Sequence, residues 1–216
     1  MANYSNLGPT ISNHNYYNLE DYYKNTKEGK IFDKYQKRVV LADENFIVGL
    51  QKGLEEEVGD VAQMIMYKCG YSWALEDMKN FDKRFKSEFD GRAIDEMNFN
   101  MVLQTWWWPL SITGWGSWDF DFSYKKQGLI FVNLYDSAVA KSLGNIGKVA
   151  CHFYAGLFAG VFTYLSKKEL EGIEIQCYSM GETFCKFMIG MDKKVNAADF
   201  WVKEGATAKE IIDKMI

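Results

Sequence analysis

The stretch Val149–Ser166 constrains the fold more than any other part of the sequence. It runs for 18 residues without a formal charge, and Gly156 and Gly160 lie four positions apart within it. Its length is near the lower limit for a membrane span, so the stretch is either a short span or a buried core helix. His152 inside the stretch and the pair Lys167–Lys168 directly after it favour the core helix. We therefore expect a globular fold built around this helix.

Composition narrows the class of protein further. The chain has 216 residues, and 48% of them are hydrophobic, which is enough for the core of one domain. The 25 basic and 29 acidic residues are spread along the chain, so we expect no nucleic-acid partner. Four cysteines are too few for a secreted disulfide scaffold, and the first residues are polar and do not resemble a signal peptide. A reducing, cytoplasmic location is expected.

Two β-hairpins are predicted from alternating apolar residues. The first joins residues 118–123 to 129–135, and the second joins 173–179 to 183–189 through a turn at Met180–Gly181–Glu182. The other periodic segments predict helices. These cover residues 43–58, 61–69, 72–85, 97–109, 136–143, 147–166, 197–203 and 206–216. The pattern indicates an α+β fold, an antiparallel β-sheet packed with helices that cover one face.

The domain organisation is simple. Residues 1–30 lack apolar periodicity and are predicted to form an N-terminal arm, while residues 31–216 form a single domain.

The sequence offers little for catalysis. Its only histidines are His14 and His152, so a nucleophile and base relay has one realistic base. Cys151 is the neighbour of His152 on a helix, where successive side chains point about 100° apart, so the two do not form a dyad. No glycine loop of the Walker or Rossmann type is present. An enzyme is not expected.

Three cysteines could meet in space. Cys177 and Cys185 flank the tight turn of the second hairpin, and the long helix could bring Cys151 to the same place. Three thiolates suit a zinc ion, with His152 or Glu174 as the fourth ligand. Alternatively, the three cysteines are small buried hydrophobic residues, as free cysteines often are.

The segment around these cysteines resembles a known family. Residues 151–160, the strand Glu174–Cys177, Gly181 and the stretch Cys185–Phe187 resemble the signature of the 4-vinyl reductase domain family, with the core of the match over residues 136–191. Its members include a bacteriochlorophyll biosynthesis protein, archaeal hydrocarbon-binding proteins and sensor domains of aromatic-responsive regulators. Their fold is similar to that of TRAPP vesicle-tethering subunits and is often dimeric. The stretch Gly49–Asp60 resembles a cyanobacterial branch associated with photosystem gene clusters.

The resemblance implies a function. It implies non-catalytic binding of a hydrophobic small molecule, a tetrapyrrole or chlorophyll precursor, in support of photosynthetic complex assembly. A homodimer, photosystem assembly proteins as partners, and a place in the cytoplasm or at the periphery of the thylakoid membrane follow from the same analogy. The alternative is a dimerising interaction module without a ligand. A reductase is a third reading, which no hydride-carrier motif supports.

The resemblance also bears on the metal. The three cysteines match ligands of zinc-binding sensor members, whose acidic ligand lies one helical turn before the first cysteine. Lys148 occupies that position here. A lysine beside the ion would repel it, so His152 would need to supply the fourth ligand.

Candidate ligand-binding residues lie on the long helix and among the tryptophans. Gly156 and Gly160 would allow close approach of a flat ligand or of the sheet, and His152 lies on the same helix. The tryptophans could line a pocket or belong to the core or a dimer interface. They are Trp106, Trp107, Trp108, Trp115 and Trp118.

Overall fold

The computed structural model describes residues 22–216, so His14 and most of the predicted arm lie outside the described residues. Contacts divide the chain into two compact units. Unit 1 comprises residues up to Ala42 together with Asn80–Gly114, and unit 2 comprises Asp43–Lys79 and Trp115–Ile216.

Unit 1 contains a small sheet and a tryptophan-rich helix. Strands β1 (Tyr23–Asn25), β2 (Ile31–Asp33) and β3 (Arg38–Val39) form an antiparallel sheet, so the end of the predicted arm is a strand. Helix α4 (Phe99–Ile112) runs past Pro109, where the sequence predicted its end. Its buried apolar side chains outweigh the backbone hydrogen bond that the proline removes. They are Val102, Leu103, Trp106, Trp107 and Leu110.

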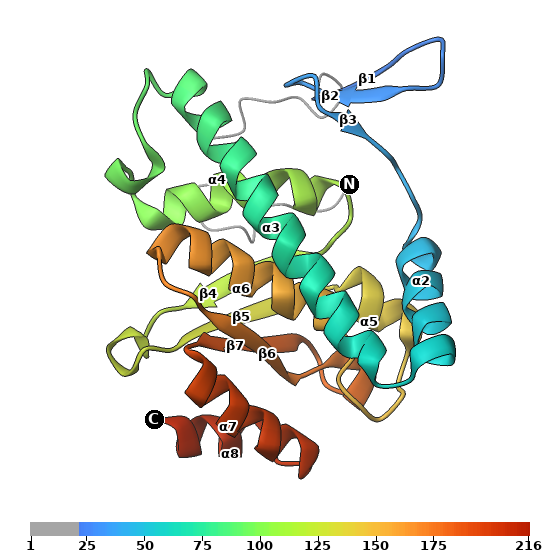
Figure 1. The fold of residues 1–216 in the computed structure, drawn as a ribbon, viewed down its shortest axis with the longest axis vertical. Helices are drawn as coiled ribbons and strands as arrows, with labels where there is room; N and C mark the ends of the chain where they lie inside the picture. The colour runs from blue at the N-terminus through green and yellow to red at the C-terminus, as the bar shows by residue number, and fades with distance from the viewer. Residues whose placement is uncertain (1–21) are drawn as a thin grey trace. The chain divides into compact units, whose positions relative to one another are not determined.

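Unit 2 is built on a four-stranded antiparallel sheet of order β4-β5-β7-β6 (Figure 1). Both predicted hairpins are confirmed, because β4 pairs with β5 and β6 pairs with β7. The strands are β4 (Ser117–Asp121), β5 (Ile130–Tyr135), β6 (Glu171–Gln176) and β7 (Cys185–Gly190). The helices of this unit are α2 (Glu44–Val58), α5 (Ala138–Leu143), α6 (His152–Ser166), α7 (Asp192–Lys203), α8 (Ala208–Met215) and the first part of α3 (Val61–Glu88). The α+β fold class is confirmed.

Helices cover both faces of this sheet, not one face as the sequence predicted (Figure 1). Side chains alternate along each strand, so Phe187 of β7 packs on Phe158 of α6 while Phe131 and Met188 join the core under α7 and α8. The short helices at the C-terminal end of the sequence were predicted but not placed, because their periodicity does not say which surface they cover.

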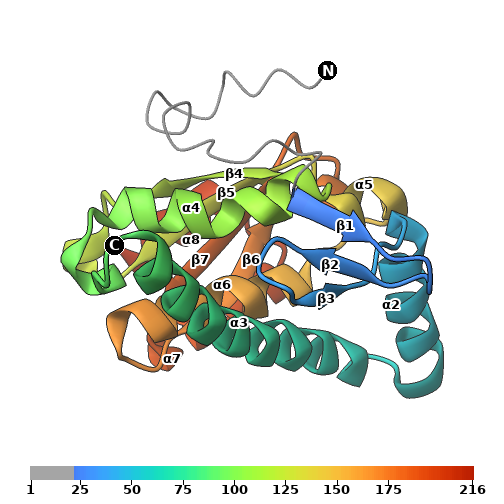
Figure 2. The same cartoon turned by 90° about the horizontal axis from the view of Figure 1, so that it is seen from above.

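Helix α3 is continuous, whereas the sequence predicted a break at Gly70. The reason is its crossing with α6 (Figure 2). A Cβ atom built on Gly70 would lie 2.0 Å from the carbonyl oxygen of Phe153, and one on Gly156 would lie 1.9 Å from that of Tyr67. Gly160 meets Ala74 and Tyr71 of α3 in the same way. The two helices therefore touch backbone to backbone, which only glycine allows.

The long apolar stretch forms a 15-residue helix, α6, rather than a longer one. Nine of its residues are buried, in agreement with the predicted core helix. Among residues 22–216, no helix combines the length and the hydropathy that crossing a bilayer requires.

Candidate functional site: a cluster of three cysteines and a glutamate

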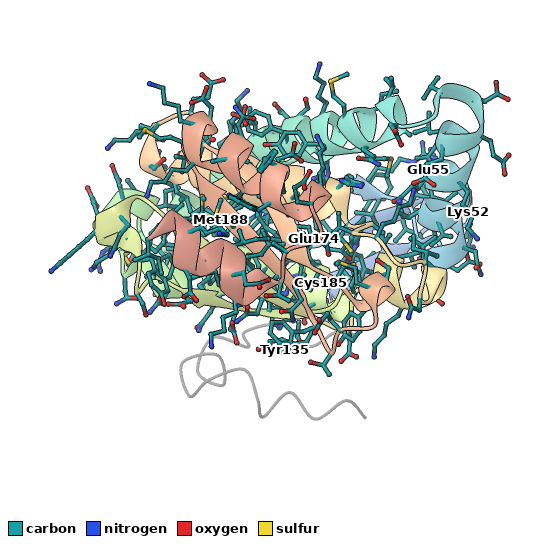
Figure 3. The ribbon with its side chains drawn as sticks, turned by 90° about the horizontal axis from the view of Figure 1, so that it is seen from below. Lys52, Glu55, Tyr135, Glu174, Cys185 and Met188 are labelled. Carbon is teal, nitrogen blue, oxygen red and sulfur yellow. The ribbon has the colours of Figure 1, made fainter. Side chains whose placement is uncertain are left out.

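Four buried acidic groups converge beside the N-terminus of α6. Cys151 precedes the helix, Glu174 lies on β6, Cys177 follows that strand and Cys185 begins β7. Their possible ligand atoms all lie within 4.8 Å of one another. Glu174 and Cys185 are labelled near one another in Figure 3. The predicted convergence of the three cysteines is confirmed.

A bulge explains how Glu174 joins the cluster. In a regular strand, side chains three positions apart point to opposite faces, so Glu174 and Cys177 would not meet. The pairing of β6 with β7 shifts between Glu174 and Gln176, where the strand carries one extra residue. Such a bulge re-aims the side chains that follow it. The sequence named Glu174 and His152 as alternatives, and the structure brings only Glu174 into the cluster.

The spacing of the sulfur atoms fits a tetrahedral metal site. The Sγ atom of Cys151 lies 4.0 Å from that of Cys177 and 3.8 Å from that of Cys185, and the latter two are 3.6 Å apart. A tetrahedral zinc ion with Zn–S bonds of about 2.3 Å holds its sulfurs about 3.8 Å apart. The cysteines are free, so no disulfide sets this spacing.

The carboxylate of Glu174 is oriented by the backbone on one side only. Its Oε2 accepts hydrogen bonds from the N–H groups of Ala150 and Cys151, at 3.0 and 2.7 Å. Its Oε1 is buried and accepts no hydrogen bond from the described residues. A buried carboxylate oxygen without a partner is costly, and a cation at the cluster would satisfy it.

Burial controls the protonation of the cluster. Burial raises the pKa of Cys151 and of Glu174 well above their ordinary values, and the nearby Cys177 raises both further. Hydrogen bonds from Cys151 and Cys185 lower the pKa of the Cys177 thiol far below its ordinary value. Burial and the hydrogen bonds among the thiols therefore shift the pKa values within the cluster in opposite directions. A divalent cation would displace the remaining protons.

Two serines and a loop surround the sulfur atoms. The hydroxyl of Ser179 lies 2.9 Å from the Sγ of Cys177 and 2.6 Å from the carbonyl oxygen of Lys148. The hydroxyl of Ser137 lies 3.4 Å from the Sγ of Cys151 and also caps α5. Metal sites commonly use such outer hydrogen bonds to orient their ligands.

Lys148 lies beside an acidic residue of α2. Its side chain is half exposed, and its Nζ lies 4.0 Å from Oε2 of Glu55 on α2. The expected repulsion of a metal ion by this lysine stays a prediction. His152 begins α6 outside the cluster, and burial lowers its pKa.

An aromatic triad lies beside α6 and includes one residue of that helix, Phe153. The rings of Trp73, Trp115 and Phe153 are 5.5 to 5.9 Å apart and within 32° of parallel. All three side chains are partly exposed. Phe153 follows Cys151 by two residues, and the backbone oxygen of Trp115 accepts a 2.7 Å hydrogen bond from Tyr154. Trp73 lies on α3 and was not among the predicted tryptophans.

The other predicted residues are placed elsewhere. Trp106 and Trp107 are buried in unit 1, where Trp108 contacts the ring of Tyr22. Trp118 is buried against Phe158 in unit 2. Gly156 and Gly160 face α3, so the expectation that this face meets the sheet or a cavity is wrong. The reason is that another helix fills the space that the glycines leave open.

Comparison with known proteins supports the resemblance over part of the chain. Residues 130–191 match the family model of the 4-vinyl reductase domain, and this segment contains all four residues of the cluster. An uncharacterized protein of Methanocaldococcus jannaschii is 35% identical over 64 residues, which cover 30% of this chain and 40% of that protein. A second uncharacterized protein of the same organism is 29% identical over 70 residues, again 40% of its length. The chain thus matches less than half of either relative.

One solved structure extends the likeness in fold to most of the chain. The phenol-responsive sensory domain of the transcription activator PoxR, solved with phenol, superposes with a TM-score of 0.59 and 20% identity. The match covers 87% of this chain and 90% of that one. A vinyl-4-reductase family protein from Methanocaldococcus jannaschii matches with a TM-score of 0.43 and 13% identity, over 67% of this chain and 76% of that one.

Proposed function

We propose that this chain is a non-catalytic receptor for a flat hydrophobic small molecule, and that a zinc ion at the cysteine cluster holds the receptor together. The observation that carries the proposal is the pair of features at one end of α6. Cys151 belongs to the four-residue cluster, and two residues later Phe153 belongs to the aromatic triad. A bound zinc ion would therefore fix the N-terminal end of α6, where Phe153 offers its ring to the ligand.

The donor set supports zinc. Three thiolates and one carboxylate in a closed, buried tetrahedron are typical of a structural zinc site, which keeps no position open for a substrate. Cys151, Cys177, Cys185 and Glu174 would hold the ion, and Ser179 and Ser137 would orient two of the sulfurs. Zinc would then contribute folding energy rather than chemistry.

Ring stacking supports a flat apolar ligand. Partly exposed, nearly parallel rings offer large apolar faces to a planar molecule. The PoxR sensory domain, which has a similar fold, was solved with phenol. We extend this ligand class to a tetrapyrrole or chlorophyll precursor, and the role to photosynthetic complex assembly by a homodimer at the thylakoid surface. These finer assignments rest on the resemblance alone.

Elemental analysis tests the metal. We expect about one zinc per chain after purification, and loss of most of it in Cys177→Ser and in Glu174→Gln. Cys69→Ser is the matched control, because Cys69 is exposed on α3 and should not affect zinc. Cobalt loading should give sulfur-to-cobalt absorption in the wild type. Less than about a tenth of a zinc per chain, with no cobalt signal, would contradict the metal site.

Fluorescence titration with phenol and with magnesium protoporphyrin tests the ligand. We expect quenching in the wild type and about tenfold weaker binding in Trp115→Leu, because the ligand loses a stacking face. Trp201→Leu on α7 is the control, since Trp201 packs under the other face of the sheet. A colourless preparation from the native host that binds neither probe would favour the dimerising module instead.

A further inference from the structure

Helix α2 presents an apolar face to the outside of unit 2. Only Val48 and Gln51 of its 15 residues are buried. Figure 3 marks the helix by Lys52 and Glu55. The exposed apolar side chains continue from α2 into the start of α3. They are Phe46 (61% exposed), Leu50 (49%), Val58 (41%), Val61 (50%) and Met64 (51%).

Two glycines lie inside the same helix, and no contact with the described residues requires them. Gly49 and Gly53 are one turn apart, and a Cβ atom built on either would meet no described atom within 4 Å. Their φ angles are ordinary, so no left-handed backbone requires them. Glycine is the poorest helix former after proline. The described residues therefore give no packing reason for these two glycines.

The structure shows what such a pair of glycines can receive. Gly156 and Gly160 have the same spacing on α6, and the backbone of α3 lies directly against them. The partner of these two glycines is a helix that itself carries small residues, Gly70 and Ala74, at the crossing. Gly49 and Gly53 offer the same spacing and an open surface on the outside of α2.

The charged residues around this face indicate which kind of partner it would bind. The exposed lysines of α2 and the start of α3, Lys52 and Lys68, are outnumbered by the exposed acidic residues on α2 and beside its ends. These acidic residues are Asp43, Glu44, Glu56, Glu57 and Asp60. A second copy would bring a further set of acidic residues, and anionic lipid would be repelled. A helix with lysine or arginine beside its apolar stripe would complement both the apolar face and the acidic residues around it.

We propose that the face of Phe46, Gly49, Leu50 and Gly53 on α2 docks a basic amphipathic helix of another protein. The apolar stripe of that helix would pack on Phe46 and Leu50, and its small residues would cross at the two glycines. Its basic residues would lie beside the acidic residues around the face. This surface is separate from the cysteine cluster and the aromatic triad, so the inference stands whether or not the proposed receptor function holds.

The test uses a fluorescein-labelled 18-residue peptide of leucine and lysine with alanines on one face, and a twin with glutamate for lysine. Anisotropy should show binding of the lysine peptide to the full chain, weaker at high salt, and at least tenfold weaker binding of the glutamate twin. Gly53→Leu should weaken lysine-peptide binding at least tenfold without lowering the melting temperature, because open space surrounds this position. Asn196→Leu, an exposed position on α7, should bind as the wild type does.

Each alternative occupant gives a distinct result that overturns the proposal. Equal binding of both peptides, or no effect of Gly53→Leu, would mean that the face does not recognise a basic helix. A concentration-dependent dimer of the chain that Gly53→Leu dissolves would assign the face to a second copy. Sedimentation with phosphatidylglycerol vesicles that Gly53→Leu abolishes would assign it to a lipid surface.

Discussion

Glycines at the same spacing have opposite surroundings in this molecule. Gly156 is pressed against the backbone of Tyr67, whereas nothing described lies near Gly53. We expect Gly156→Ala to lower the free energy of unfolding by about 1–3 kcal/mol, because the added methyl group forces α3 and α6 apart. Gly53→Ala should raise it by up to about 1 kcal/mol through helix propensity. Urea unfolding of both variants measures the difference.

Similar stabilities for the two variants would show that α3 and α6 do not touch at Gly156. The sequence predicted a steric requirement at Gly156 and Gly160, and the structure confirms it. It assigned the neighbour wrongly, because helix periodicity identifies a face but not the element that covers it. Gly70, the third glycine of the crossing, was interpreted as the end of a helix.

At the scale of elements, one buried glutamine ties α2 to the segment that precedes α6. Gln51 donates a 3.2 Å hydrogen bond to the carbonyl oxygen of Ala150, whose N–H binds Glu174 of the cluster. We expect Gln51→Leu to speed amide exchange in α2 about tenfold or more, because Ala150 and Glu55 lose a donor. Hydrogen exchange with mass spectrometry measures this, with Gln63→Leu on α3 as the control.

Unchanged exchange in α2 would mean that Val48 and the contact with α5 suffice to hold it. Among the elements, the hairpins and the first helix were predictable, since Asp43 caps α2 as its side chain suggested. The continuity of α3 and the extension of α4 past Pro109 were not. In both cases buried contacts override a residue that ends helices in isolation.

At the scale of the whole molecule, removal of the proposed zinc should loosen unit 2. We expect a strong zinc chelator to lower the melting temperature by about 5 °C or more, because Glu174 and the thiols lose their shared cation while remaining buried. Calorimetry under reducing conditions measures the shift, and Cys69→Ser protein should behave as the wild type does. An unchanged melting temperature after chelation would mean that the cluster is stable without a metal ion.

The sequence predicted the three cysteines of the candidate site but left its fourth member open. Two residues that flank the turn of a hairpin and one at the start of the preceding core helix can be brought together by topology alone. Glu174 depended on a bulge, and the position of Lys148 depended on Glu55 of a different helix. The aromatic triad joins Trp73, Trp115 and Phe153 from three separate segments, which no single stretch of sequence reveals.

The cluster draws its members from positions far apart along the chain. Cys151 and Cys185 are separated by 34 residues, whereas Cys177 and Cys185 are separated by 8. A shared ion would act as a cross-link that shortens the unfolded chain, with the larger loop contributing the greater loss of entropy. During synthesis Cys185 leaves the ribosome last of the four. The cross-link would therefore close only once Cys185, the first residue of β7, has emerged.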